Sequence, residues 1–118
     1  MATFSKAIFS SSTDGLPISV TQTATAGNLI HTCSTTTSVL EEIWLYATNT
    51  SASDVVLTVE WGNATASNNI KYTVKAANGL YLITPGLIIK GNATPYTIRA
   101  FAATTAVISI TGYVNRIS

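Results

Sequence analysis

Two residues with metal-binding and nucleophilic chemistry stand two positions apart in the segment LIHTCST. His31 and Cys33 would point to the same face of a strand, because side chains alternate along a strand. A zinc site takes three or four ligands, the chain has no other histidine or cysteine, and a carboxylate could complete the set only if the fold brought one there. A cysteine–histidine nucleophile would need side chains that meet across elements and a third group that orients the imidazole. We therefore expect two ordinary strand residues, with no metal and no cofactor.

The carboxylates are too dispersed for acid–base catalysis. Glu41 and Glu42 are adjacent, so on a strand they point to opposite faces and cannot flank one bond. Asp14 and Asp54 fall in turn-like segments, and Glu60 is isolated. The sequence also lacks a Gly-rich phosphate loop, a Ser-His-Asp pattern and an Asp-rich calcium loop. We expect a protein that is not an enzyme.

Aromatic residues recur through the chain and could form a binding platform. Exposed rings stack on the faces of sugars, but such a platform normally places Asp, Asn or Arg beside the rings, and this sequence has few charges to offer. Burial in a core or at a subunit interface is the commoner fate of large aromatic side chains, and we expect it here. The residues concerned are Trp44, Tyr46, Trp61, Tyr72, Tyr81, Tyr96, Phe101 and Tyr113.

Hydroxyl side chains, rather than charges, dominate the polar part of the composition. The 118 residues include 20 Thr and 12 Ser, whereas charged residues make up 9%, against about 25% in an ordinary domain. Because exposed lysine and glutamate keep monomers apart, a surface so poor in charge indicates assembly with other chains. The basic residues are scattered and the net charge is +1, so we expect no nucleic-acid partner.

Short β-branched and aromatic segments, separated by Gly, Pro, Asn and Ser, predict an all-β fold. We expect a single-domain antiparallel β-sandwich, jelly-roll-like, because six to nine short strands in one domain suit a sandwich, a jelly roll or a barrel. A helix over 36–45 is an alternative to the third strand, but the β-rich continuation favours the strand. The expected strands are 16–23, 28–34, 42–49, 55–61, 70–75, 80–90 with a break at Pro85-Gly86, 96–102 and 106–115.

Three turn signals predict local hairpins. They are the loop 50–54, the pair Asn78-Gly79, which favours a two-residue turn, and the pair Ala103-Thr104. The strand before the first loop is apolar on both faces, with Ile43 and Leu45 on one side and Trp44 and Tyr46 on the other. We expect one face to be the core and the other a subunit interface that includes Trp44, Tyr46 and Trp61.

The N-terminal segment 1–15 differs from the rest. Its apolar residues Phe4, Ile8 and Phe9 show no clear alternation, and Asp14-Gly15 ends it with a turn signal. We expect an extended arm that docks on a partner, followed by the sandwich domain 16–118; an edge strand or a tail is the alternative. No apolar run has the length of a signal peptide or a membrane helix, so we expect synthesis in a cytoplasm and no membrane partner.

Three stretches carry a resemblance to known proteins: EEIWLYATNTSASDVVLTVEWG at 41–62, GLYLITPGLIIKGN at 79–92 and IRAFAATTAVISITGYVNRI at 98–117. In their strand and turn sequence they resemble small proteins that tailed phages, including cyanophages, encode among their virion structural genes. The resemblance covers roughly 29–117. It contains no catalytic motif, so no catalytic residue is carried over.

The resemblance implies a capsid decoration (cement) protein. Such proteins are small, rich in β-structure and commonly trimeric, and they attach to the outside of the phage head between capsomers. Its partners would then be further copies of itself, as a homotrimer, and the major capsid protein, and its location the capsid exterior. Phe4, Ile8 and Phe9 would face the capsid. The alternative is a carbohydrate- or receptor-binding module on a tail fibre or on the head, with a host surface glycan as ligand.

Overall fold

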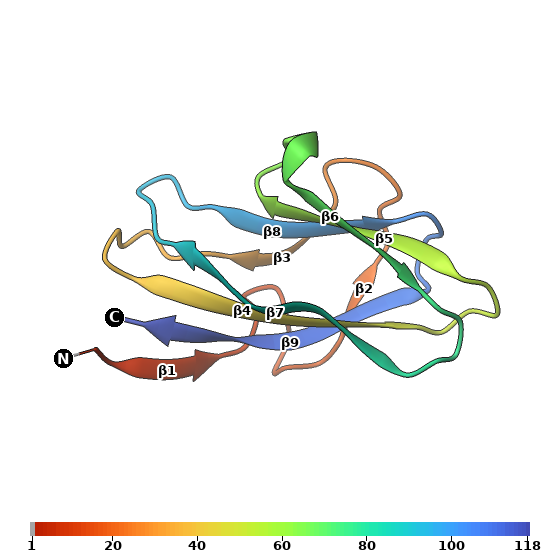
Figure 1. Cartoon of the computed structure of the whole chain (residues 1–118), viewed down its shortest axis with the longest axis horizontal. Helices are drawn as coiled ribbons and strands as arrows, with labels where there is room; N and C mark the ends of the chain where they lie inside the picture. The colour runs from red at the N-terminus through yellow and green to blue at the C-terminus, as the bar shows by residue number, and fades with distance from the viewer. Residues whose placement is uncertain (1) are drawn as a thin grey trace.

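The computed structural model describes residues 2–118 as two antiparallel sheets packed face to face (Figure 1). This confirms the all-β sandwich. No helix in this range is long and apolar enough to cross a membrane. Within the range the chain forms a short 3-10 helix, η1 (Ala66–Asn68), and nine strands: β1 (Phe4–Ala7), β2 (Ile18–Val20), β3 (Asn28–Thr32), β4 (Leu40–Asn49), β5 (Val55–Gly62), β6 (Asn69–Val74), β7 (Leu80–Lys90), β8 (Thr97–Ala102) and β9 (Ile108–Ile117).

The strand order is that of a jelly roll. The first sheet runs β1-β9-β4-β7, with β2 also paired to β9, and the second runs β3-β8-β5-β6. The pairs β2·β9, β3·β8, β4·β7 and β5·β6 form one long antiparallel hairpin whose tip lies between β5 and β6. Rolling that hairpin brings β4 against β9 and β5 against β8, which completes both sheets.

The three expected local hairpins are wrong. Each predicted turn joins strands of different sheets: β4 to β5, β6 to β7, and β8 to β9. Within the described chain, the neighbouring strands that do pair with one another are β5 and β6, around η1. A turn signal specifies a reversal of the chain, but it does not specify whether the next strand pairs alongside or crosses to the facing sheet.

The core lies between the sheets and follows the alternation of β4. Ile43, Leu45 and Ala47 are fully buried and face the second sheet, whereas Trp44 and Tyr46 point outward and are partly exposed. Both apolar faces expected for this strand are therefore present. The first face is the core, where it meets residues of β5, β8 and β9 such as Leu57, Ile98 and Ile110.

The N-terminal segment belongs largely to the sandwich, which revises the expected separate arm. Phe4–Ala7 forms β1 and pairs with β9, and Phe9 is 1% exposed in the core. Phe4 and Ile8 are exposed, as an arm would require. Phe9 was expected to face a capsid, but it packs inside its own chain, because the antiparallel pairing of β1 with β9 ends at Ala7 and Val114 and Phe9 then lies over Gly112 in the middle of β9. Met1, also part of the expected arm, lies outside the described residues.

Gly112 on β9 makes the space that Phe9 fills. Its φ is +147°, and a Cβ atom there would lie 1.9 Å from the carbonyl oxygen of Trp44 and 3.0 Å from the Phe9 ring. Backbone and core would both have to move to admit a side chain. The absence of a side chain at Gly112 thus couples the N-terminal segment to the first sheet.

We expect Gly112→Ala to lower the free energy of unfolding by at least about 2 kcal/mol, since it combines a clash with an unfavourable φ. Gly79→Ala is the control, because Gly79 has φ +85° with nothing within 4 Å of the added Cβ. It should cost only about 1 kcal/mol of backbone strain. Urea unfolding measures both, and equal losses would contradict the packing argument.

Candidate functional site

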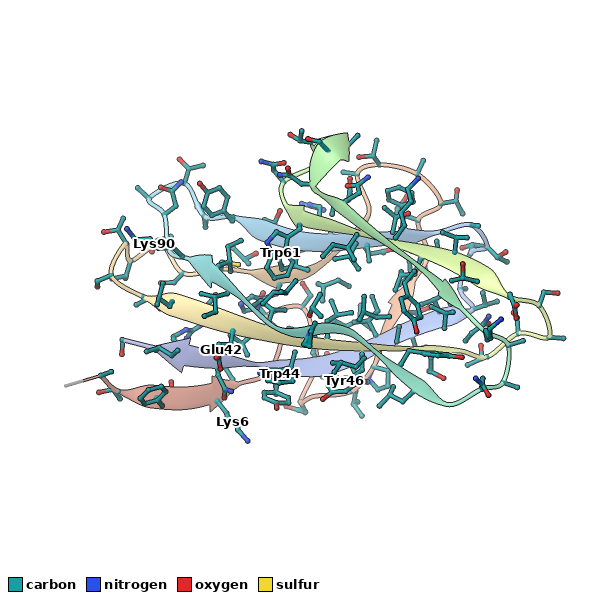
Figure 2. All side chains as sticks on the ribbon, viewed as in Figure 1. Lys6, Glu42, Trp44, Tyr46, Trp61 and Lys90 are labelled. Atoms are coloured by element: carbon teal, nitrogen blue, oxygen red, sulfur yellow. The ribbon has the colours of Figure 1, made fainter. Side chains whose placement is uncertain are left out.

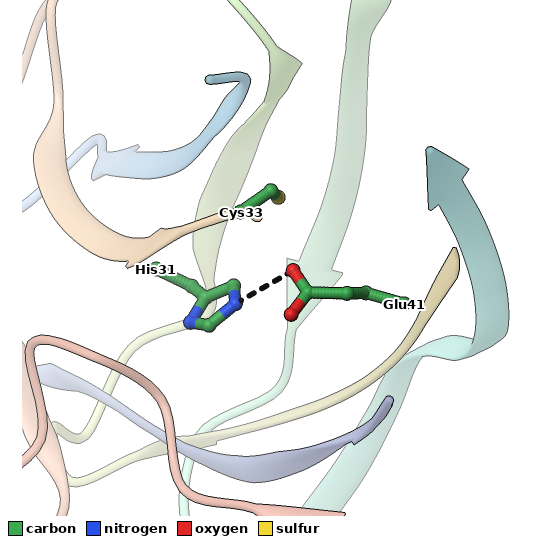
Figure 3. A group of neighbouring side chains, drawn as sticks. All are labelled: His31, Cys33 and Glu41. Carbon is green, nitrogen blue, oxygen red and sulfur yellow. Dashed lines mark hydrogen bonds and ion pairs between the residues drawn. The ribbon is translucent and has the colours of Figure 1, made fainter. Parts of the chain in front are cut away.

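Polar side chains that could bind a metal or take part in catalysis meet at one end of the core. We call this group the Glu41 cluster; it consists of His31, Cys33, Glu41 and Arg116. Glu41 is fully buried and accepts hydrogen bonds from Arg116 Nη2 at 2.6 Å and Arg116 Nε at 2.7 Å. It also accepts from His31 Nε2 at 3.1 Å and from the backbone N–H of Ser34 at 3.2 Å. Figure 3 shows the imidazole and the carboxylate pointing toward one another, with Cys33 beside them. The carboxylate is thus surrounded by donors.

The hydrogen bonds of His31 decide what the cluster can bind. Its Nδ1 accepts from the backbone N–H of Ser10 at 3.1 Å, so the ring proton belongs on Nε2, which donates to Glu41. His31, Cys33 and Glu41 place their ligand atoms within 4.8 Å of one another. Glu41 is thus the carboxylate that the fold brings to His31 and Cys33. A metal would need the Nε2 lone pair and would compete with Arg116 for Glu41. The geometry favours a hydrogen-bonded anchor.

The cluster also sets the ionisation of its acids. Burial alone would raise the pKa of Glu41, but hydrogen bonds from His31 and Arg116, and the charge of Arg116, outweigh it and hold that pKa below the ordinary 4.5. Burial, followed by the charge of Glu41 and a hydrogen bond to it, raises the pKa of Cys33 to about 12. Glu41 is therefore an ionised acceptor and Cys33 a neutral thiol at neutral pH.

We expect Glu41→Gln to lower the free energy of unfolding at pH 7 by about 2 kcal/mol, because it removes the charge of a buried carboxylate that accepts several hydrogen bonds and pairs with the partly exposed Arg116. Glu42→Gln is the control, since Glu42 lies on the outer side of β4, is only partly buried and accepts from Asn115 at 3.1 Å. It should cost less than about 0.5 kcal/mol.

The lowered pKa of Glu41 also predicts that the stability of the protein depends on pH. A depressed folded-state pKa stabilises the fold above the unfolded value, and this stabilisation is lost as the pH falls through the folded-state pKa. Wild type should therefore lose stability on acidification below about pH 4.5 more steeply than Glu41→Gln does. Parallel curves of unfolding free energy against pH for the two proteins would refute the assignment.

We expect Cys33 to be inert toward thiol reagents in the folded protein. A buried thiol with a pKa of about 12 has little thiolate at pH 8, so alkylation should be at least roughly a hundredfold slower than in guanidinium. Iodoacetamide labelling followed by mass spectrometry measures both rates. Similar rates in the folded and unfolded protein would contradict burial of the sulfur.

A second candidate site is the outward side of the first sheet, which we call the outer face. Residues paired across antiparallel strands point to the same side, so the register with β4 identifies them. They form a broad surface that is mostly apolar and aromatic. The outer face consists of Phe4, Lys6, Leu40, Glu42, Trp44, Tyr46, Thr48, Leu80, Leu82, Pro85, Ile88, Lys90, Ser109, Thr111, Tyr113, Asn115 and Ile117.

A stack of side chains crosses the middle of the outer face. The Lys6 ammonium lies 5.1 Å from the centroid of the Tyr113 ring, and Tyr113 stacks on Trp44 at 6.0 Å and 13°. Trp44 Nε1 is buried and has no acceptor among the described residues. An added Cβ on Gly86 would lie 2.8 Å from the indole. This indole is therefore held by stacking on Tyr113 and by close contact with the Gly86 backbone, and not by a hydrogen bond.

The residues expected at a subunit interface fall into two groups. Trp44 and Tyr46 lie on the outer face, whereas Trp61 on β5 packs against the core (Figure 2). Leu82 and Ile88, which are 41% and 54% exposed beside β4, also belong to the outer face and were not expected there. Ile88 pairs with Glu42 before the two register shifts between β4 and β7, and Leu82 pairs with Tyr46 after them. The expected break at Pro85-Gly86 marks this irregularity but does not specify the register on either side of it.

The second sheet, by contrast, is partly covered by its own chain. Glu60 on β5 points away from the core yet is fully buried. It accepts from Thr25 Oγ1 at 2.5 Å and from the backbone N–H of Gly27 at 2.6 Å, and Arg99 donates to the Gly27 carbonyl at 3.1 Å. The segment before β3 therefore lies over this side of the second sheet, while the outer face of the first keeps exposed apolar residues.

Comparison of the chain with protein-family models, curated proteins and solved structures found no match. No pocket opens among residues 2–118. The Glu41 cluster and the outer face are therefore the two candidate sites among the described residues.

Proposed function

We propose that this protein is a capsid decoration (cement) protein, a homotrimer that binds the major capsid protein on the outside of a phage head and bridges capsomers without covalent bonds. The observation that carries the proposal is the outer face, a large apolar surface on a chain with 9% charged residues. The resemblance to phage structural proteins supports it. So does the jelly-roll topology, which recurs in viral capsid proteins but also hosts other functions.

The Glu41 cluster supports a structural rather than an enzymatic role. Its carboxylate and imidazole are engaged in bonds that join parts of the same chain, and its thiol is neutral. A nucleophile or general base needs a free lone pair directed at a substrate. We infer that these residues stabilise the sandwich.

A cement protein acts by burying surface across the joints between capsomers. Each Å² of apolar area removed from water contributes about 25 cal/mol before association costs, and attachment at several points multiplies the effect. Phe4 and Ile8, 71% and 48% exposed beside the β1 edge, are the candidate capsid contacts. Packaged DNA pushes the capsomers apart, and such bridges would resist their separation.

We expect the protein to bind saturably to heads of the encoding phage from which its gene has been deleted, measured by co-sedimentation. Ile8→Asp should weaken binding at least about tenfold, because it places a charge in an apolar contact at an exposed residue that lies outside the outer face. Val56→Asp is the control, since Val56 is 42% exposed on the opposite sheet, and it should bind as wild type does.

Cryo-EM of the complete virion gives the decisive picture. Density for the protein on the capsid exterior is the expected result. Virions that lack density for the protein would contradict the proposal, and so would density found on a tail fibre alone.

The second candidate, a carbohydrate- or receptor-binding module, is favoured by one observation, the Tyr113–Trp44 pair on the outer face. Saturable binding on a glycan array that is lost in Tyr113→Ala would support it. The decoration role predicts head binding whether or not a host surface glycan also binds.

A further inference from the structure

The free edges of both sheets are protected against pairing with other chains. β7 carries Pro85 and two register shifts, β2 is three residues long, and β1 is four residues long with an exposed Lys6. β3 has a register shift next to His31, and β6 carries an exposed Lys71. Charges, proline, bulges and short strands are the features that prevent association through strand edges. Assembly of this chain therefore has to use a face.

The outer face lacks this protection. Leu80 and Leu82 are 59% and 41% exposed, and Ile88 is 54% exposed, beside the half-buried Trp44 and Tyr113. Figure 2 shows Trp44, Tyr46 and Lys6 on the side of the first sheet that faces away from the second. Exposed apolar side chains on β7, beside an aromatic pair on β4 and β9 and with three charged residues among them, form a surface typical of a protein interface.

The size of the outer face fits a stable contact. β4 has ten residues, and at about 3.4 Å per residue and about 4.8 Å between four strands the face covers roughly 650 Å². A standard interface buries about 800 Å² on each partner, so the face with its surrounding loops is large enough.

The charges of the outer face also suit a second copy. Lys6 on β1 and Lys90 on β7 lie toward its two margins, and Glu42 on β4 lies between them. Because both signs are present, different parts of the face on neighbouring copies of a trimer can meet without placing like charges together.

We propose that the outer face is covered by another copy of this chain, with Trp44 and Tyr113 at the centre of the contact. The inference rests on the proposed function, for which it specifies the subunit contact. It also excludes Trp61 from that contact, because Trp61 packs against the core of its own chain.

Sedimentation velocity over a concentration series tests the proposal with two matched variants. Leu82→Lys places a charge on the outer face, and Val56→Lys places the same charge on the opposite sheet at a residue of nearly equal exposure, 41% against 42%. Wild type should assemble at micromolar concentration. Leu82→Lys should raise the apparent dissociation constant at least about tenfold, whereas Val56→Lys should stay within about twofold.

Circular dichroism and thermal melting confirm that both variants are folded. A wild-type protein that is monomeric at about 100 μM would overturn the inference, since an interface of this size holds at far lower concentration. Equal effects of the two lysines would overturn it as well. A monomer that binds glycans through Tyr113 would assign the face to a sugar.

The head-binding assay separates this inference from the proposed function. Monomeric wild type that still decorates heads would remove the self-contact and leave the decoration role intact. Wild type that assembles through the outer face but does not bind heads would contradict the decoration role and leave the self-contact intact.

Discussion

The buried carboxylate of Glu41 is the interaction on which one end of the sandwich depends. It belongs to β4, binds Arg116 of β9 and His31 of β3, and through His31 reaches the backbone of Ser10. Four segments from both sheets therefore converge on one anion. Desolvating a charge is costly unless it is paired and hydrogen-bonded, so the cluster admits few alternative arrangements of these strands. The apolar core supplies most of the favourable free energy, while Glu41 fixes how the sheets meet.

One side of the first sheet forms the core and the other forms the outer face, and β4 contributes residues to both. Odd residues of β4, such as Ile43 and Leu45, belong to the core with Glu41, and even residues, such as Trp44 and Tyr46, belong to the outer face. The second sheet has its own covering segment over Glu60. Only the first sheet among the described residues thus presents a broad apolar side, and the proposed roles depend on this asymmetry.

Sequence patterns predicted the strands but not their partners. Eight expected strands lie within three residues of observed ones, because alternation and turn residues act locally. The opposite directions of Glu41 and Glu42 also follow from alternation. The contact of Glu41 with Arg116 spans 75 positions and depends on rolling the whole chain, and Tyr113 meets Trp44 for the same reason. β1 matches the edge strand that was the alternative to an arm in 1–15, but its bounds could not be predicted because its residues do not alternate: Phe4, Ser5 and Lys6 are all exposed at a sheet edge.

The long rolled hairpin also constrains how the chain can fold. The β5·β6 pair joins neighbouring segments around η1, whereas β4·β7, β3·β8 and β2·β9 close progressively larger loops, up to Ile18 against Ile110. Each closure costs chain entropy before its contacts form, and folds dominated by such distant pairs acquire structure slowly. The N- and C-terminal ends, joined by hydrogen bonds between Thr3 and Ser118, belong to the outermost layer of this sequence of closures. Residues up to the end of β9 must therefore leave the ribosome before the sandwich can close, and until then the apolar strands depend on dilution or chaperones to stay apart.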